Sequence, residues 1–298
     1  MRIFSPQGVL QQQKVLAART LAHLAVTALV AEAELTPKPA LVDRRGSGAH
    51  TDLTLALMKR SAQTLSGTFA TIAFASMDHS PDQALREHLG EIGREGERAM
   101  LEVTHGVNTH RGAIWAMGLL VAGAAIAGLT APARHITARA GELAHLPDRF
   151  APDMPSHGLS MQKRYGVAGA RGEAQRDFPC VIEWGLPTLR AVRQRGATET
   201  CARLDALLAI MTQLDDTCLL YRGGLDALRE ARESARAVLC AGGTGTAAGL
   251  DQLSLLESSL LLRHASPGGS ADLLAATLFL DALASGTPPA EGGREWNV

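Results

Sequence analysis

The chain has 298 residues, of which 29 are Lys or Arg and 30 are Asp or Glu, so its formal net charge is −1. Because the two signs are mixed along the chain, there is no single-sign field of the kind that attracts nucleic acid or an anionic membrane, and we expect neither partner. The four cysteines are widely spaced and form no CxxC pair, which is typical of reduced structural thiols and not of a zinc site.

Composition also predicts the fold class. Aromatic residues make up 4% of the chain, alanine and leucine abound, and β-branched residues seldom cluster. The summed propensities favour helices over strands, so we expect an all-α protein. Its length suits a single catalytic domain over residues 1–298.

The first predicted helix runs from Gln11 to Leu35, where apolar residues follow helical spacing and two prolines then end it. Residues 20–33 within it imitate the apolar region of a signal peptide. Roughly 20 residues precede that apolar core, and it carries His23, so we expect a cytoplasmic protein. A charged loop follows, and a second helix is predicted to begin near Asp52.

The next helix is predicted from the segment Ser80-Pro81-Asp82-Gln83 to about Val103, with Ser80 as its N-cap and Gln83 closing a capping box. The stretch from Gly112 to Ala133 contains no charge and is long enough to span a bilayer. Its alanines and regularly spaced glycines favour instead a central helix, buried in a compact bundle and approached closely by its neighbours.

The second half of the chain begins with a loop. Three prolines between residues 147 and 160 predict a surface loop or a subdomain boundary. Further helices are expected at about 187–196, 198–222, 225–240, 250–264 and 271–285. Residues 286–298 are rich in proline and glycine and are expected to fray.

The loop after the first helix is the first candidate site. It concentrates Lys38, Asp43, Arg44, His50 and Asp52 in one short stretch. Such a loop could place cations on phosphates and carboxylates on a metal or a hydroxyl group. The alternative is a solvated turn, because charged loops are common.

A second candidate precedes the apolar helix, where Asn108, His110 and Arg111 lie at its N-terminal end. Free N–H groups and the helix dipole favour an anion at such an end, which suits a phosphate. The alternative is that these residues only cap the helix, with Thr109 as a good capping residue.

Two adjacent acids form a third candidate. Continuing the apolar stripe of the helix predicted at 198–222 puts Asp215 on the buried face, next to Asp216. Adjacent carboxylates could hold Mg²⁺ against a polyphosphate, because magnesium prefers hard oxygen ligands. The alternative is a structural ion pair between Asp215 and Arg222, two turns further on.

The glycine turn before the last helix is a fourth candidate. Its two glycines, Gly268 and Gly269, would let backbone N–H groups approach an anion closely, and Ser270 could act as the N-cap. Ser266 begins the same turn. The segment is either a phosphate cradle or a tight turn, and its spacing leaves both open.

Five segments follow one another along the chain: Glu34–Arg44 with Gly48-Ala49-His50, Gly106–Gly112, Ala170–Ala174 with Phe178-Pro179, Asp215–Thr217 with Arg222-Gly223-Gly224, and Ser266–Ala275. Taken in order, they resemble the triphosphoribosyl-dephospho-CoA synthases, most closely the version that serves malonate decarboxylase. The sequence departs from the family pattern at Ala40, usually Gly, at Arg111, often Lys, and at Asp215, commonly Glu.

The resemblance implies an all-helical transferase that joins ATP and 3′-dephospho-CoA. The 2′-hydroxyl of dephospho-CoA attacks the anomeric carbon of the ATP ribose, adenine leaves, and the triphosphate is retained. The product, 2′-(5″-triphosphoribosyl)-3′-dephospho-CoA, is the precursor of a prosthetic group on the acyl carrier subunit of malonate decarboxylase, although citrate lyase partners use similar chains. From its length we expect a chain without extra domains, similar to the stand-alone enzyme of a malonate decarboxylase system. A homodimer is compatible with the resemblance.

The resemblance also implies roles for individual residues. Mg²⁺, held by Asp215 and Asp216, would bind the triphosphate. The general base would be one of Glu34, Asp43, Asp52 and Glu173, a choice that needs geometry. The residues expected to bind the nucleotides are Lys38, Arg44, His50, Asn108, His110, Arg111, Arg171, Arg222, Ser266, Gly268, Gly269 and Ser270.

Two alternatives stay open from the sequence. One is a Mg²⁺-dependent N-glycosidic hydrolase or ADP-ribosyl-processing enzyme, which breaks the same bond with water as nucleophile. The other is a protein without catalytic activity that binds nucleotides or acts as a chaperone for the acyl carrier subunit. Adenine release that depends on dephospho-CoA would distinguish the transferase from the hydrolase.

Overall fold

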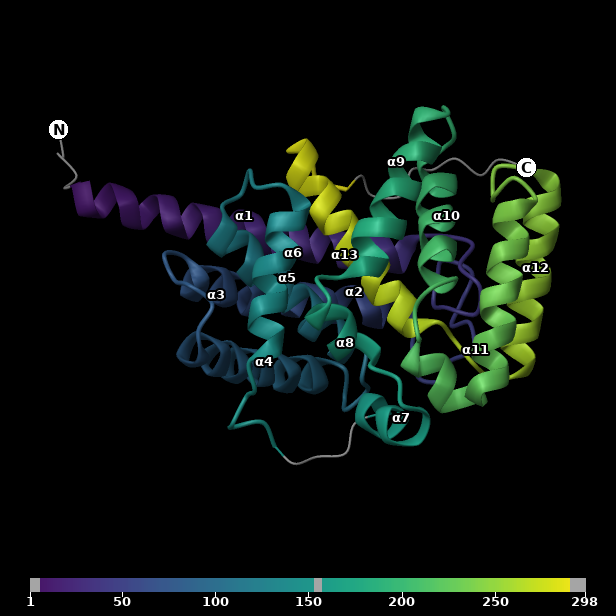
Figure 1. Ribbon diagram of the computed structural model, residues 1–298, viewed down its shortest axis with the longest axis horizontal. Coiled ribbons are helices and arrows are strands. Elements are labelled where there is room, and N and C mark those ends of the chain that lie inside the picture. The colour runs from purple at the N-terminus through teal and green to yellow at the C-terminus, as the bar shows by residue number, and fades with distance from the viewer. Residues whose placement is uncertain (1–5, 153–156, 290–298) are drawn as a thin grey trace.

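The computed structural model describes residues 6–152 and 157–289 and confirms the all-α fold (Figure 1). In this part of the chain the only β-type pairing is an isolated bridge between Asp43 and Gly46. The helices are α1 (Pro6–Glu34), α2 (Leu55–Thr64), α3 (Ser66–Ser76), α4 (Gln83–Val103), α5 (Arg111–Ala127), α6 (Ala133–His145), α7 (His157–Tyr165), α8 (Gly169–Gln175), the π-helical η1 (Cys180–Gly185), α9 (Leu186–Gln194), α10 (Glu199–Met211), α11 (Thr217–Cys240), α12 (Ala247–Leu262) and α13 (Gly268–Ser285).

Helix α5 is the central helix that the apolar stretch predicts. Twelve of its seventeen residues are buried, and α1, α3, α6 and α13 pack around it. Its small residues allow this packing, since a Cβ atom on Gly123 would lie 2.4 Å from the Ile136 carbonyl oxygen of α6. The helix ends earlier than predicted, because Gly128 takes a φ of +94° and Pro132 then precedes α6 as its N-cap residue.

Helix α1 has two differing halves. Its first turns project from the bundle (Figure 1) and expose Leu10 and Leu16, while its later turns are buried from Leu21 onward among α3, α5 and α13. By length and composition alone, Gly8–Glu34 could cross a membrane, yet 56% of its most apolar window is buried inside the protein. That burial favours a core helix.

Two predicted boundaries were wrong. The N-cap of α4 is Asp82, not Ser80, because the Asp82 carboxylate accepts a hydrogen bond from Leu85 N at 2.8 Å. The single helix predicted at 198–222 is also interrupted. It ends at Met211, and α11 then continues through the predicted gap at 223–224 with a kink at Gly224, where φ is 68°.

The chain between α5 and α9 is more helical than predicted. It forms α6, α7, α8 and η1, and α7 begins inside the proline-rich segment predicted as a loop. A single cluster of buried apolar side chains extends from Ala18 to Ala282. The single domain and the boundary at 147–160 stay predictions, and residues 153–156 and 290–298 lie outside the described part of the chain.

Candidate active site

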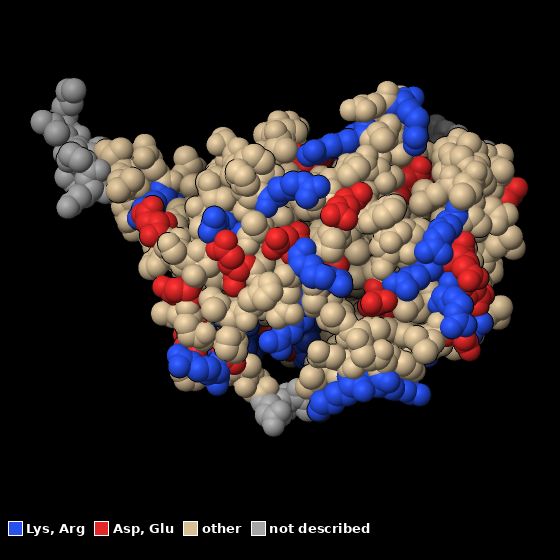
Figure 2. Space-filling view, in the orientation of Figure 1, with Lys and Arg blue, Asp and Glu red and all other residues tan. Residues whose placement is uncertain are grey.

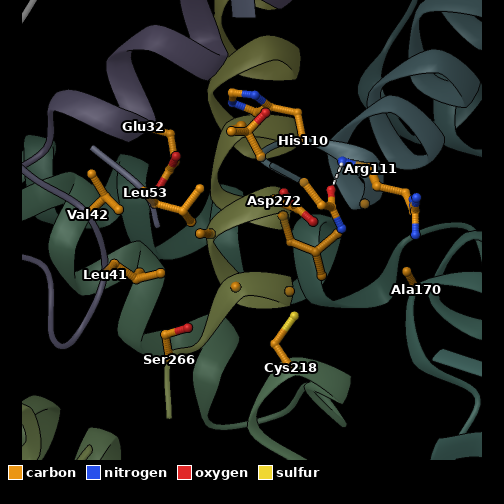
Figure 3. Close-up of a pocket in the computed structure, with 18 of the residues that line it drawn as sticks. Glu32, Leu41, Val42, Leu53, His110, Arg111, Ala170, Cys218, Ser266 and Asp272 are labelled. Atoms are coloured by element: carbon orange, nitrogen blue, oxygen red, sulfur yellow. Dashed lines mark hydrogen bonds between the residues drawn. The ribbon is translucent and has the colours of Figure 1, made fainter. Parts of the chain in front are cut away.

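The segments singled out by sequence meet around one cavity of about 320 Å³ (Figure 3). Its walls come from the end of α1, the charged loop, the start of α5, the turn between α10 and α11, and the start of α13. Segments from both ends of the chain are thereby brought together. The predicted site residues that line the cavity are Lys38, His50, Asp52, Asn108, His110, Arg111, Asp215, Arg222, Ser266, Gly268 and Gly269.

A buried ion pair lies on one wall of this cavity. Lys38 Nζ donates to Glu32 Oε1 at 2.5 Å and to the Glu32 carbonyl oxygen at 2.7 Å, and both side chains are almost fully buried. The pair joins the charged loop to the last turns of α1. Lys38 is therefore already neutralised by a protein carboxylate before any phosphate binds.

Asp272 is the carboxylate that lacks such a partner. It lies in the first turns of α13, half-buried, and points into the cavity toward the space that Glu32 also faces (Figure 3). Among the described residues it forms no hydrogen bond or ion pair. Burial raises the pKa of Asp272 well above its usual value, and the negative charges of Glu32 and Asp216 raise it further.

Gly112, in the first turn of α5, makes room for this carboxylate. A Cβ atom at position 112 would lie 2.1 Å from Asp272 Oδ2, so only glycine permits the observed approach. The carboxylate therefore lies against the N-terminal turn of α5, where the helix dipole is positive.

His110 is the N-cap residue of α5 and is buried. Its Nδ1 lies 2.8 Å from Ser61 Oγ, whereas its buried Nε2 has no hydrogen-bond partner in the described structure. Burial, followed by the charge of Lys38, lowers the pKa of His110 to about 4. The ring is therefore neutral at pH 7, with one nitrogen left for a ligand.

His50 joins the charged loop to the glycine turn. Its Nε2 lies 2.9 Å from Ser266 Oγ, and its Nδ1 accepts a hydrogen bond from Arg222 Nη2 at 3.2 Å. Because Nδ1 accepts, the ring proton is on Nε2, which donates to Ser266. Burial and the charge of Arg222 lower the pKa of His50 to about 4, so this ring is also neutral at pH 7.

Asp216, predicted to hold magnesium, is the carboxylate that joins the starts of two helices. Its Oδ1 accepts from the backbone N–H groups of Cys218, Leu219 and Gly269 at 2.9, 3.4 and 3.3 Å. Its Oδ2 accepts from Ser270 N at 2.8 Å and Ser270 Oγ at 2.9 Å. One buried carboxylate thus caps α11 and α13 together.

This arrangement argues against two of the sequence interpretations. The N–H groups of Gly269 and Ser270, proposed as a phosphate cradle, are already occupied by Asp216. The Asp216 oxygens, engaged by five donors, are in turn not free to bind magnesium. Asp215 lies at the cavity but pairs with Arg232 at 2.9 Å, not with Arg222. Within the described residues, no group of three or more candidate metal ligands occurs.

The remaining predicted residues lie outside the cavity lining. Glu34 pairs with Arg44 at 2.8 Å and with Lys59, and Asp43 accepts from Lys38 N at 3.0 Å. Both are buried and shape the charged loop. Glu173 is buried beneath η1, where it accepts from Cys180 N at 2.6 Å, and burial raises the pKa of its carboxyl group. Arg171 is exposed on α8.

Sequence reasoning missed Glu32 and overlooked Asp272 as a site residue. Glu32 lies inside an apolar helix, close before Glu34, and only the fold shows which of the two faces the cavity. Asp272 belongs to a segment that was singled out for its glycines. The charged lining comprises four acids against three bases, Glu32, Asp52, Asp215 and Asp272 against Lys38, Arg111 and Arg222.

Comparison with known proteins identifies the family. The sequence model of the CitG family, the ATP:dephospho-CoA triphosphoribosyl transferases, matches residues 18–289. A relative from Stutzerimonas stutzeri is 58% identical over 93% of this chain and 96% of its own length, and one from Azotobacter vinelandii is 57% identical over 89% and 92%. Both are named "Probable 2-(5''-triphosphoribosyl)-3'-dephosphocoenzyme-A synthase". No solved structure matches. The chain belongs to the family of ATP:dephospho-CoA triphosphoribosyl transferases.

Proposed function

We propose that this transferase joins the triphosphoribosyl group of ATP to the 2′-hydroxyl of 3′-dephospho-CoA in the cavity that contains Asp272. The observation that supports this site is an unpartnered, half-buried carboxylate with a raised pKa, set among two neutral histidines and a buried ion pair. Such a combination is typical of a general base in an active site.

Asp272 is the residue that fits the base. Its carboxylate takes the proton of the 2′-hydroxyl as that oxygen bonds to the anomeric carbon of the ATP ribose. The bond from that carbon to adenine breaks, and its electron pair leaves on adenine, which then takes up a proton. The nearby carboxylates Glu32 and Asp272 also favour the positive charge that develops on the ribose during displacement.

The charges that line the cavity support the binding of magnesium together with ATP. A triphosphate is strongly anionic, while the charged side chains of the cavity are four acids and three bases, and two of those bases, Lys38 and Arg111, are paired with protein carboxylates. We therefore propose that Mg²⁺ comes bound to ATP and supplies the missing positive charge. The pair Asp215 and Asp216 does not fit a preformed site, because Arg232 and five hydrogen-bond donors already engage these carboxylates.

The destination of the product is proposed from the resemblance to the malonate decarboxylase version of the family. We propose that the product is passed on toward the acyl carrier subunit of that enzyme, in the cytoplasm, where both substrates occur. Supplying the product and the next transferase to purified apo-carrier subunits of malonate decarboxylase and citrate lyase tests the choice. Preferential modification of the citrate lyase carrier would overturn it.

The reaction is tested by mass spectrometry of the products formed from ATP, dephospho-CoA and Mg²⁺. The expected result is equal amounts of adenine and triphosphoribosyl-dephospho-CoA, with no adenine when dephospho-CoA is left out. Adenine release without dephospho-CoA would indicate the hydrolase, and nucleotide binding without any turnover would indicate the binding protein or chaperone.

A further inference from the structure

A second cavity, of about 380 Å³, lies beside the first, between α4, α5 and the loop that follows α6. Arg111 lines both cavities, so they adjoin at the N-terminus of α5. Figure 2 shows a hollow with basic side chains on its walls, in the region where Figure 1 places α4 and α8. The rest of the lining is largely apolar or glycine and includes Ile72, Leu89, Gly90, Gly93, Ile114, Trp115, Gly118 and Leu119.

Two of the three guanidinium groups in this cavity are neutralised by protein carboxylates. Arg94 Nη1 donates to Asp148 Oδ2 at 2.5 Å, and Arg111 Nε donates to Glu97 Oε1 at 2.5 Å. These are the two acids of the lining. The cavity therefore has a surplus of one positive charge.

The surplus positive charge of the second cavity is on Arg86. Its side chain is more than nine-tenths buried, its Nε has no hydrogen-bond partner among the described residues, and its closest carboxylate oxygen, on Asp148, is 3.8 Å away. The guanidinium lies 5.2 Å from the centre of the Trp115 ring. A buried cation with an unused hydrogen-bond donor is unfavourable unless a ligand accepts that hydrogen bond and offsets the charge.

The neighbours of Arg86 point to an anionic ligand. Burial lowers the pKa of the Arg86 guanidinium, the Asp148 carboxylate opposes this shift, and the positive charges of Arg171 and Arg94 lower the pKa further. A bound anion would act in the same direction as Asp148 and offset the burial and the two positive charges. Arg171, expected from sequence to bind phosphate, thus adds to the positive potential at Arg86 in this second cavity.

We propose that the second cavity binds the diphosphate and pantetheine arm of dephospho-CoA. The inference rests on the proposed reaction, in which the two riboses meet beside Asp272 and the remainder of each substrate must extend into adjoining space. Arg111, at the junction, and Arg86 would face the diphosphate. Trp115 and the apolar walls would pack along the methyl and methylene groups of pantetheine.

Gly93 offers a way to fill the cavity without disturbing the fold. It lies inside α4, and the closest atom to a Cβ there would be Ile114 Cγ2 at 4.0 Å, so a larger side chain meets open space. Gly93→Leu should keep or raise helix stability while occupying the volume of the arm. Gly67→Leu is the matched control, because Gly67 lies on α3, exposed and with nothing within 4 Å.

The test is calorimetric titration of each folded variant with dephospho-CoA, with ADP, which lacks the pantetheine arm, and with ATP. Gly93→Leu should weaken dephospho-CoA binding about tenfold or more and leave ADP and ATP binding unchanged, while Gly67→Leu changes none of them. Unchanged dephospho-CoA affinity in Gly93→Leu, or weaker ATP binding, would overturn the proposal.

Binding is measured without turnover, so the two proposals can fail separately. If the reaction is wrong, no triphosphoribosyl product forms, whatever the titrations show. If only the arm site is wrong, wild-type protein and Gly93→Leu make the product with the same KM for dephospho-CoA.

Discussion

Asp216, the N-cap residue of α11, and Asp272, in the first turns of α13, both lie near the N-terminus of α13, but their surroundings differ. Asp216 is fully buried and accepts five hydrogen bonds from two helix N-termini, whereas Asp272 accepts none from the described residues and faces a cavity. Burial raises the pKa of both carboxyl groups, but the backbone donors oppose it only at Asp216. A satisfied buried acid stabilises the fold, and an unsatisfied one is available for chemistry.

Removing the charge of Asp272 tests the reactive half of this comparison. Asp272→Asn keeps the shape of the side chain but removes the base, so kcat should fall by about 10² to 10⁴-fold. Because the pKa of Asp272 is raised in the folded state, this carboxyl group lowers stability as the pH rises above its ordinary, unfolded-state pKa, so the variant should be at least as stable as wild type at pH 7. Steady-state kinetics beside a thermal melt measure both. Wild-type kcat would exclude Asp272 as the base.

Removing the Asp216 carboxylate tests whether this residue stabilises the fold. Asp216→Ala leaves the N-termini of α11 and α13 without their shared cap, and the free energy of unfolding should fall by about 3 kcal/mol. Asp215→Ala, which loses one half-exposed pair with Arg232, is the control and should cost less than about 1 kcal/mol. Denaturant unfolding measures the difference. Equal stability in the two variants would contradict the capping role.

Moving the Asp272 carboxylate without altering its chemistry should also reduce turnover. In Gly112→Ala the new methyl group would occupy the position 2.1 Å from Asp272 Oδ2, so the carboxylate must shift. A shift of this size should lower kcat by about 10 to 100-fold. Gly67→Ala, on an exposed part of α3, is the control for a glycine replacement in a helix. Unchanged turnover in Gly112→Ala would mean that the observed position of the carboxylate is not needed.

The negative charge of Glu32 should be visible in the pH dependence of the reaction. The base must be ionised, so activity is lost as the pH falls through its pKa. Glu32→Gln removes a charge that raises the pKa of Asp272 and frees Lys38, and both changes favour ionised Asp272. The acid limb of kcat/KM should therefore move to lower pH. If the acid limb of kcat/KM stays at the same pH in Glu32→Gln, the limb reports the ionisation of another group and not of Asp272.

Local sequence patterns predicted the fold class and the central helix well. The uncharged stretch from Gly112 to Ala133, with its regularly spaced glycines, favoured a buried helix, and most residues from Ala113 to Ala125 are buried. The helices between residues 133 and 185 were missed because they are short and lie among prolines and glycines, where period and propensity carry little information. The end of α10 was missed because Leu214, beyond the end of the helix at Met211, is also apolar and buried and so continues the stripe.

Local patterns also indicated which segments form the site, but not which atoms in them are free. The two partners of Asp216 on α13 are distant from it in the sequence, and His50 pairs with Ser266, close to the other end of the chain. Such pairings depend on the packing of helices that sequence spacing does not describe. The glycine turn therefore resembled a phosphate cradle, although a carboxylate of the same chain occupies it.

The smallest predicted effect on activity and stability is that of a substitution at Arg44 in the charged loop. Arg44 was expected from sequence to bind phosphate, but its half-exposed side chain pairs with Glu34 outside the cavity. In Arg44→Ala, Glu34 keeps its pair with Lys59, so the variant should lose less than about 1 kcal/mol of stability. The KM for ATP should stay within about twofold of wild type, because no cavity contact is lost.

Lys38→Ala is the matched contrast within the same loop. Lys38 is almost fully buried, and its removal leaves Glu32 without a counter-charge, which should cost about 3 to 5 kcal/mol. Kinetics with varied ATP and denaturant unfolding of both variants separate the two positions. A KM for ATP raised about tenfold in Arg44→Ala, at unchanged stability, would show that the loop reaches the triphosphate and that the site extends beyond the cavity around Asp272.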